Sequence, residues 1–229
     1  MSERVEGEPP AVDINVRSIG IIGGTGALGR GLASRLSAAR WSVVIGSRDS
    51  ERARAHAAAL LRVGSPVSGA GNVDACACDL VILAVPWSAH ASTISELAPH
   101  LGGKLVVDAV NPLAFDDRGP HALRAESGSA TEDAQRLLPS STVVGAFHHV
   151  SADVLLSSIA LDTDVLVVGE DREAIRRVIR VVDSVAGLRG VYAGRLRNAG
   201  QVEALTANLL AMNRRYRTQV GIRMTGITD

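Results

Sequence analysis

The chain has 229 residues, of which 46% are hydrophobic but only 3% aromatic, so its core must be aliphatic and rich in alanine. Lys+Arg and Asp+Glu balance at 24 each, which argues against partners recognised by a global field, such as nucleic acid or an anionic membrane. Residues 1–17 lack the apolar core of a signal peptide, and no apolar run is long enough to span a membrane. We therefore expect a cytoplasmic protein.

Short apolar strands alternate with helices through the first two thirds of the chain. This alternation predicts right-handed βαβ units in one doubly wound, mainly parallel α/β sheet of the Rossmann type. Residues 115–129 are polar and contain glycine, so we expect a surface loop there, followed by a helix that Thr131 caps. The expected strands are 18–22, 41–46, 80–85, 104–110 and 142–147, and the expected helices are 27–39, 50–61, 89–97 and 131–138.

The remaining third predicts a small α/β extension of the sheet. The amphipathic segment 172–185 and the long segment 197–215 are expected helices. Met212 and Asn213 on the second one suit a core, a dimer interface or the roof of a ligand cleft. The expected strands here are 164–168, 191–193 and an edge strand at 221–225. We divide the chain into a flexible lead (1–17), a Rossmann domain (18–151) and an extension (152–229).

The first strand ends in a glycine-rich turn that opens a helix. Gly24, Gly26 and Gly29 have the G-x-G-x-x-G spacing of a dinucleotide-binding turn. Gly24 permits the sharp turn, Gly26 lets the backbone approach a pyrophosphate, and Gly29 lets the helix pack closely. The free N–H groups and dipole of the helix from Ala27 then face the phosphates.

The end of the second strand indicates which nucleotide is bound. An NAD enzyme places Asp or Glu there to hold the ribose 2′-hydroxyl, but this chain has Ser47 and Arg48, with Arg52 one helical turn further on. Serine and arginine bind a 2′-phosphate, which a carboxylate would repel. The alternative is that these arginines and Arg54 only solvate a helix and pair with Glu51. The missing acid favours NADP.

Two histidines follow the last Rossmann strand, at the sheet edge where α/β proteins bind ligands. A neutral imidazole at His148 or His149 could donate a hydrogen bond to a cofactor. The alternatives are a structural histidine or a metal pair, but adjacent histidines on an extended segment point in opposite directions, so we expect no metal. Trp87 suits a core, an interface or a cofactor wall equally well.

The chemistry of other NADP enzymes does not fit this composition. Lys104 is the only lysine and falls at the start of a strand, so neither a Tyr-x-x-x-Lys pair nor a catalytic lysine on the helix after the Rossmann unit is present. An acceptor that needs positioning more than acid catalysis fits better, as in hydride transfer between two cofactors. Cys76 and Cys78 are too close in sequence for an ordinary disulfide and suit small buried side chains.

The chain as a whole resembles the F420-dependent NADP oxidoreductases, also called NADPH-dependent F420 reductases. The resemblance runs in order from residue 18 onward. The membrane ferric reductases of the STEAP type have a related domain, but this chain lacks their transmembrane part. The segments that carry the resemblance are 21–29, 46–48, 85–87, 108–113, 146–150 and 221–223.

The resemblance implies a hydride transfer between nicotinamide C4 of NADP(H) and C5 of the deazaflavin coenzyme F420, in a homodimer. It places His148 and Val150 beside the reacting rings. His149 departs from the pattern, because archaeal members have a less polar residue there. The cofactor-binding residues that it implies, together with those derived above, are Gly24, Thr25, Gly26, Ala27, Leu28, Gly29, Ser47, Arg48, Arg52, Val85, Pro86, Trp87, Asn111, Pro112 and His149.

Two other functions remain open from the residues alone. The first is an NADPH-dependent reductase of another acceptor, such as a flavin, a quinone or an imine. The second is a sensor without enzymatic activity, in which bound NADPH changes the affinity for a partner protein. Pro86, Trp87 and His148 suit a second planar ligand beside the nucleotide. An enzyme needs such a ligand and a sensor does not, so these residues favour an enzyme.

Overall fold

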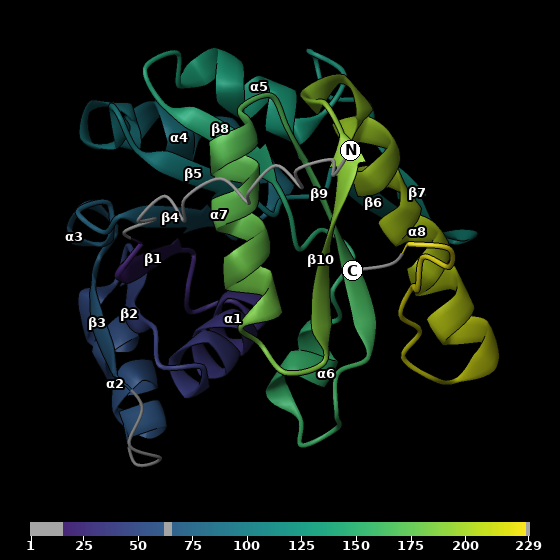
Figure 1. Ribbon diagram of the computed structural model, residues 1–229, viewed down its shortest axis with the longest axis horizontal. Helices are drawn as coiled ribbons and strands as arrows, with labels where there is room; N and C mark the ends of the chain where they lie inside the picture. Colours follow the sequence, from purple (N-terminus) through teal and green to yellow (C-terminus); the bar gives the residue numbers. More distant parts are fainter. Residues whose placement is uncertain (1–15, 62–65, 228–229) are drawn as a thin grey trace, which may run out of the picture.

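The computed structural model describes residues 16–61 and 66–227, and within them eight strands form one sheet in the order β10-β9-β8-β5-β4-β1-β2-β3 (Figure 1). Neighbouring strands are parallel except β8 and β9, which are antiparallel. The predicted doubly wound, mainly parallel sheet is therefore confirmed. The strands of this sheet are β1 Ser18–Ile22, β2 Ser42–Ser47, β3 Val67–Gly71, β4 Leu80–Leu83, β5 Leu105–Asp108, β8 Thr142–Gly145, β9 Thr163–Gly169 and β10 Leu188–Gly194.

Helices cover both faces of the sheet, and each face has its own aliphatic core. On one face, β1, β2 and β9 pack against α1, α2 and α7, and on the other, β4 and β5 pack against α3, α4 and α5. None of the helices described is long and apolar enough to cross a membrane. The helices are α1 Ala27–Ala38, α2 Ser50–Leu61, α3 Asn72–Ala75, α4 Trp87–Leu101, α5 Ala130–Leu137, α6 Ala152–Leu156, α7 Arg172–Asp183 and α8 Ala199–Tyr216, with a 3-10 turn at Leu196–Asn198.

Aliphatic side chains decide this arrangement. All four residues of β4 are fully buried between β1 and β5, which explains an apolar run without alternation. In α1, Leu32 and Leu36 stand one turn apart and both face the core. The strands and helices expected from the apolar periodicity are present within a few residues, except at the end of the chain.

The chain after α8 does not form the predicted edge strand at 221–225. Its backbone contacts β9 once, where the N–H of Asp164 donates to the carbonyl of Ile222 at 2.8 Å. Side chains replace the other ladder bonds: the Ile222 N–H donates to Thr163 Oγ1 at 3.0 Å, and the Met224 N–H donates to the Asp164 carboxylate at 2.6 Å. The tail is therefore fixed beside the sheet without becoming a strand of it.

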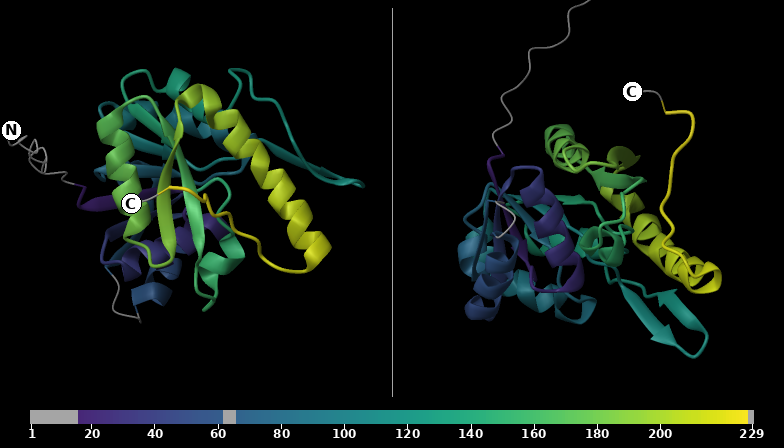
Figure 2. Two further views of the ribbon diagram at one scale, coloured as in Figure 1. Left: turned by 45° about the vertical axis from the view of Figure 1, so that its right-hand side comes forward. Right: turned by 90° about the horizontal axis from the view of Figure 1, so that it is seen from below.

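Strand β3, helix α3, a hairpin within 113–122 and helix α6 were not predicted. Strand β3 is rich in glycine because a Cβ on Gly69 would lie 2.2 Å from the Ala53 carbonyl carbon in α2, a close approach that a propensity argument does not detect. The expected loop at 115–129 begins with a hairpin, β6 Leu113–Asp116 and β7 Gly119–Ala122, that packs against α8 and projects from the body (Figure 2). Most of the predicted flexible lead, residues 1–15, lies outside the described residues.

Candidate active site

The carboxyl ends of β1, β4, β5 and β8 meet at one edge of the sheet, because these strands are parallel neighbours. The glycine-rich turn leaves β1, Val85 follows β4, Asn111 follows β5, and His148 follows β8. Open α/β sheets bind ligands at this edge. Most of the residues that we predicted for the site therefore lie along it.

The glycine-rich turn is tightly packed between β2 and α1. Within it, Gly23 has a positive φ of 76°. Gly24 is required for space, because a Cβ there would lie 2.9 Å from Ile45 Cγ2, and its N–H donates to the Gly46 carbonyl at 3.0 Å. A Cβ on Gly29 would lie only 2.6 Å from Gly24 Cα. The turn therefore admits α1 only because both positions lack a side chain.

Helix α1 presents an open N-terminus at this turn. Its N-cap, Gly26, offers no side-chain acceptor, and its first turn contains no acidic residue. The first N–H groups of a helix have no partner inside the helix, and its dipole places positive charge there. Thr25 is half-buried and Ala27 is exposed, so a ligand can reach these groups. This geometry suits a phosphate.

The end of β2 carries positive charge without a protein partner. Arg48 and Arg52 are exposed, and neither forms an ion pair among the residues described, so the alternative pairing with Glu51 is not observed. Asp49 is close in sequence, but its Oδ1 accepts the N–H groups of Glu51 and Arg52 at 3.0 Å and so caps α2. Ser47 is buried and its Oγ accepts the Asp49 N–H at 3.1 Å.

Arg30 adds to this positive region and was not predicted. It follows Gly29 in α1, and its Nε is buried without a partner in the described part of the chain. Burial, and then the charges of Arg30 and Arg52, lower the pKa of His56 in α2. The two helices therefore direct cationic side chains toward one region, which a sequence motif on a single helix does not reveal.

The turn after β8 has strained backbone geometry. Phe147 is fully buried and has a φ of 65°, which is unusual for an aromatic residue. The Val150 N–H donates to the Phe147 carbonyl at 3.2 Å, so His148 and His149 occupy the centre of a β-turn. We had expected an extended segment. The two rings nevertheless have different surroundings.

His148 has a fixed backbone and a buried ring. Its carbonyl accepts hydrogen bonds from Asn111 Nδ2 at 2.6 Å and Thr206 Oγ1 at 3.0 Å. The ring is buried and interacts with the backbone of Val110, and Asn111 Oδ1 has no partner among the described residues. Burial lowers the pKa of His148 to about 4, so the ring is neutral near pH 7. Donors and acceptors of a ligand amide would satisfy these atoms.

A buried pair supports this region from α4. His90 Nε2 and Asp108 Oδ2 are 2.6 Å apart and both side chains are fully buried. Burial lowers the pKa of His90, but its hydrogen bond to Asp108 and the charge of Asp108 outweigh it, so the net shift is upward. The Trp87 ring lies against His90, with centroids 5.4 Å apart. Trp87 thus packs on the protein at the start of α4 and is half-buried rather than part of the core.

Glu203 of α8 joins the extension to the Rossmann unit. Its carboxylate accepts the N–H groups of Ala130 and Thr131 and the Thr131 hydroxyl, at 2.8–3.0 Å. The cap of α5 is therefore Ser129, not Thr131 as predicted. Burial raises the pKa of Glu203 to about 7, even though these hydrogen bonds lower it. Sequence reasoning missed Glu203, because its partners are more than seventy residues away in the chain.

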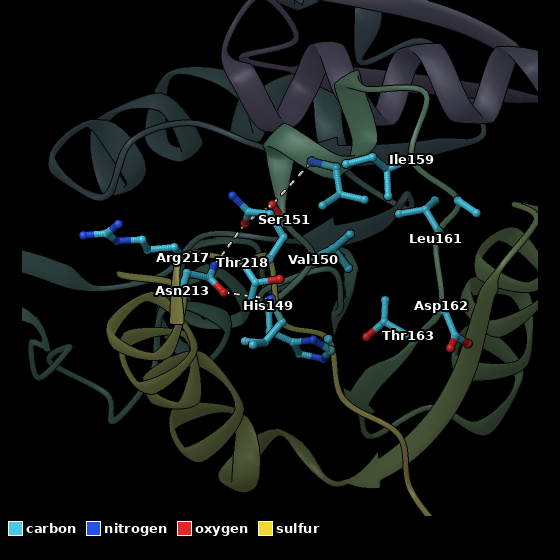
Figure 3. A pocket seen from close by; sticks show the side chains of 15 residues that line it. His149, Val150, Ser151, Ile159, Leu161, Asp162, Thr163, Asn213, Arg217 and Thr218 are labelled. Carbon is cyan, nitrogen blue, oxygen red and sulfur yellow. Dashed lines mark hydrogen bonds between the residues drawn. The ribbon is translucent and has the colours of Figure 1, made fainter. Parts of the chain in front are cut away.

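A cavity of about 760 Å³ lies on the other side of the β8 turn (Figure 3). His149 and Val150 line it from the turn, Val154 lines it from α6, and Asn213 lines it from α8. Its wall is mainly apolar with several hydroxyl and amide groups, and the volume is that of a site for an organic ligand. The remaining residues that line it come from segments 159–163 and 217–221.

Comparison with known proteins identifies the family. Residues 18–112 match the family described as NADP oxidoreductase, coenzyme F420-dependent. The F420-dependent NADP reductase of Methanothermobacter thermautotrophicus is 34% identical to this chain, over 95% of this chain and 99% of that protein. The corresponding protein of Methanocaldococcus jannaschii is 37% identical, over 91% of this chain and 98% of that protein. The chain belongs to the F420-dependent NADP reductase family.

A solved structure from Arthrobacter sp. FB24, described as a candidate F420-dependent NADP reductase, is also similar. It has a TM-score of 0.75 and 26% identity, over 91% of this chain and all of that one. The likeness to F420-dependent NADP reductases therefore extends through both the Rossmann unit and the extension.

In this member of the F420-dependent NADP reductase family, the predicted site residues fall into three groups. The glycine turn and Ser47, Arg48 and Arg52 form the positive end of the edge. His149 and Val150 line the cavity. The third group lies at the ends of β4, β5 and β8 and contains Val85, Pro86, Trp87, Asn111, Pro112 and His148.

No cluster of three or more His, Cys, Asp or Glu residues suited to a metal occurs in the part of the chain that the structure describes.

Proposed function

We propose that the protein transfers a hydride between NADP(H) and the deazaflavin coenzyme F420. The observation that carries this proposal is the turn at 147–150, which borders two sites at once. Asn111 binds the His148 carbonyl at the nucleotide edge, and the next two side chains, His149 and Val150, line the cavity. A turn that borders both sites can hold two planar ligands against one another, as direct transfer requires.

The residues at the glycine turn fit NADP. The open N-terminus of α1 would bind the pyrophosphate beside Thr25, Ala27 and Leu28. Ser47, Arg48 and Arg52 would bind the 2′-phosphate, since the arginines have no ion pair among the described residues that the nucleotide would have to displace. The nucleotide would thus replace water around exposed guanidinium groups, not a protein carboxylate.

The ends of β4, β5 and β8 fit the nicotinamide. Val85, Pro86, Trp87 and Pro112 would enclose the ring, while the unpartnered Asn111 Oδ1 and a ring nitrogen of His148 would bind its carboxamide. When bound, NADPH would supply a hydride from C4 to C5 of coenzyme F420, and one proton from solvent would complete the reduced deazaflavin. The protein's own contribution is to hold the rings, exclude water and keep His148 neutral.

The lysine chemistry of other NADP enzymes is not available here. Nζ of Lys104, the only lysine, donates to the carbonyls of Ala77 and Cys78 at 3.0 Å. Lys104 precedes β5 and so stands at the amino end of that strand, opposite the ligand edge. Carbonyl reduction with a lysine acid is thereby disfavoured, and transfer between two positioned rings remains.

We also infer that the protein is a homodimer. The last turns of α8 and the β6–β7 hairpin project together from the body (Figure 2). They expose Phe115 and Tyr216, each 71% accessible, and Met212 at 43%. A second copy would cover these apolar side chains. The molar mass from light scattering should be that of a dimer, and Phe115→Glu should shift it toward a monomer; a wild-type monomer would refute the inference.

The direct test of the proposed reaction is anaerobic mixing of the protein with NADPH and oxidised coenzyme F420. We expect loss of the visible absorbance of the deazaflavin with NADPH and far less with NADH. His148→Ala should slow this reaction and leave the fold intact, whereas an unchanged rate would give His148 a structural role only. Tight NADPH binding without bleaching would reject the acceptor and retain the nucleotide site.

A further inference from the structure

His90 connects the strand ends that border the proposed nicotinamide site. It lies in the first turn of α4, which follows β4, and the Trp87 ring packs against its ring with centroids 5.4 Å apart. Its Nε2 is 2.6 Å from Oδ2 of Asp108, the last residue of β5. A carboxylate can only accept a hydrogen bond, so His90 is the donor. Both side chains are fully buried, so water does not compete for this hydrogen bond.

Asp108 extends the connection to the turn after β8. Its other oxygen, Oδ1, accepts the Val110 N–H at 2.8 Å and thereby fixes the backbone after β5. The next residue, Asn111, donates from Nδ2 to the His148 carbonyl at 2.6 Å. The His148 ring also interacts with the backbone of Val110. One chain of contacts therefore runs from α4 through the end of β5 to the β8 turn.

Stability alone does not account for this buried pair. The other residues of β5 are buried and aliphatic, and an aliphatic side chain in place of Asp108 would suit a strand covered on both faces. Replacing a buried ion pair by apolar side chains of similar volume is often neutral or stabilising. The pair lies at the carboxyl end of β5, where α/β sheets bind ligands, so a role toward the ligand is favoured.

We propose that His90 is a positioning residue for hydride transfer, which holds the nicotinamide against its acceptor by fixing the ends of β4, β5 and β8. This proposal rests on the proposed function. His90 does not touch the ligand in this role, and it acts through Trp87 on one side and through Asp108 and Asn111 on the other. Hydride transfer needs the reacting carbons about 3–3.5 Å apart, and a displacement of about 1 Å can cost about 100-fold in rate.

The role predicts that the transfer rate and the nucleotide affinity respond differently. The pyrophosphate and the 2′-phosphate would bind at the glycine turn and at Arg48, beyond the strand ends that His90 connects. Loss of the hydrogen bond from His90 should therefore slow the transfer and leave the NADPH dissociation constant nearly unchanged. A residue that only stabilised the fold would lower both together.

Two variants of the whole protein differ only in the reach of one donor. The amide nitrogen of Gln extends about as far from the backbone as His Nε2, whereas that of Asn stops short. After rapid anaerobic mixing of the NADPH complex with coenzyme F420, we expect a transfer rate about 10- to 100-fold lower in His90→Asn and less than about 5-fold lower in His90→Gln. His100→Leu, at an exposed histidine of α4, is the matched control. Thermal unfolding shows that each variant is folded at the assay temperature.

Fluorescence of bound NADPH tests the same role without the acceptor. Nicotinamide emission depends on the surroundings of the ring, so the spectrum should change in His90→Asn and resemble the wild type in His90→Gln. Equal transfer rates in the two variants, or a rate loss matched by a loss of NADPH affinity, would overturn the inference and leave the proposed function standing. If the wild type bound NADPH without transfer to coenzyme F420, the proposed function would fall, and the emission spectra would still decide whether His90 places the nicotinamide.

Discussion

The arginines at the two ends of the molecule are used in opposite ways. At the end of β2, Arg48 and Arg52 are exposed and form no ion pair among the described residues. In the extension, Arg189 and Arg223 both bind the carboxylate of Asp164, with N–O distances of 2.8 Å, and that carboxylate is fully buried. The cations at the end of β2 therefore have no ion pair within the described residues, whereas those in the extension are neutralised by a carboxylate.

This difference distinguishes arginines that can bind a ligand from arginines that stabilise the fold. A guanidinium already bound by a carboxylate gains little from a phosphate, whereas an unpaired one gains a full charge-assisted contact. The cluster around Asp164 instead fixes the tail after α8, because its carboxylate also accepts the Met224 N–H. The predictions below test each end separately.

The largest effect is expected at the glycine turn. Gly29→Ala would place a methyl group 2.6 Å from Gly24 Cα, so the turn must shift and NADPH affinity should fall more than about 100-fold. The matched control is Gly102→Ala, because a Cβ at Gly102 has no neighbour within 4 Å and its φ is −54°. Titration with NADPH measures both variants. Normal binding by Gly29→Ala would show that the turn does not hold the pyrophosphate.

At the other end, Asp164→Asn should destabilise the fold and leave NADPH binding nearly unchanged. Removing a buried charge from its partners costs several kcal/mol, but the arginines are partly exposed, so we expect about 1–3 kcal/mol in the free energy of unfolding. Asp117→Asn, in the exposed hairpin, is the control. Urea unfolding at pH 7 gives the difference.

The same variant has a defined pH dependence. The hydrogen bond from Arg189 is the main reason that the pKa of Asp164 lies far below its usual range. Its stabilising contribution is therefore complete above about pH 4, the unfolded value, and is lost as the pH falls toward the folded value. The difference in the free energy of unfolding between the wild type and Asp164→Asn should become smaller only below pH 4. A gap that closed near neutral pH would contradict this assignment.

Arg48→Ala should weaken NADPH binding by about 1.5–3 kcal/mol, the size of a hydrogen bond to a charged group, and leave NADH binding nearly unchanged. Arg54→Ala, on the same helix and also exposed, is the control for a general loss of positive charge. Binding of both nucleotides is measured at one ionic strength. Equal losses for NADPH and NADH would reject the 2′-phosphate assignment.

The smallest effect concerns the buried histidines. Burial lowers the pKa of His148 to about 4, so the folded state takes up a proton less readily than the unfolded state, whose histidine pKa is about 6.5. The stability from a neutral His148 is complete above pH 6.5 and is lost progressively toward pH 4, by about 1 kcal/mol at pH 5.5. His148→Leu should lose less stability between pH 7 and 5.5 than the wild type. If the free energy of unfolding fell equally with pH in both proteins, the result would argue against a buried neutral ring.

The sequence by itself predicted most strands and helices of the sheet and indicated a candidate nucleotide end. These depend on local periodicity and on residues close in the chain, such as the glycine turn and Ser47-Arg48, so their pattern is visible without a fold. The glycine-rich strand β3 was missed because Gly69 is explained by its close approach to α2, not by strand propensity.

Only the tertiary structure decided the surroundings of the histidines. Segments far apart in sequence meet at three places. These are the hydrogen bond from Leu166 to His149, the hydrogen bonds between Thr131 and Glu203, and the cavity between α6 and α8. Likewise, Arg48 and Arg223 are the same type of residue, and only the carboxylates of Asp162 and Asp164 beside Arg223 distinguish a structural arginine from one open to a ligand. Burial and pairing are properties of the folded chain, so a residue's type cannot reveal them.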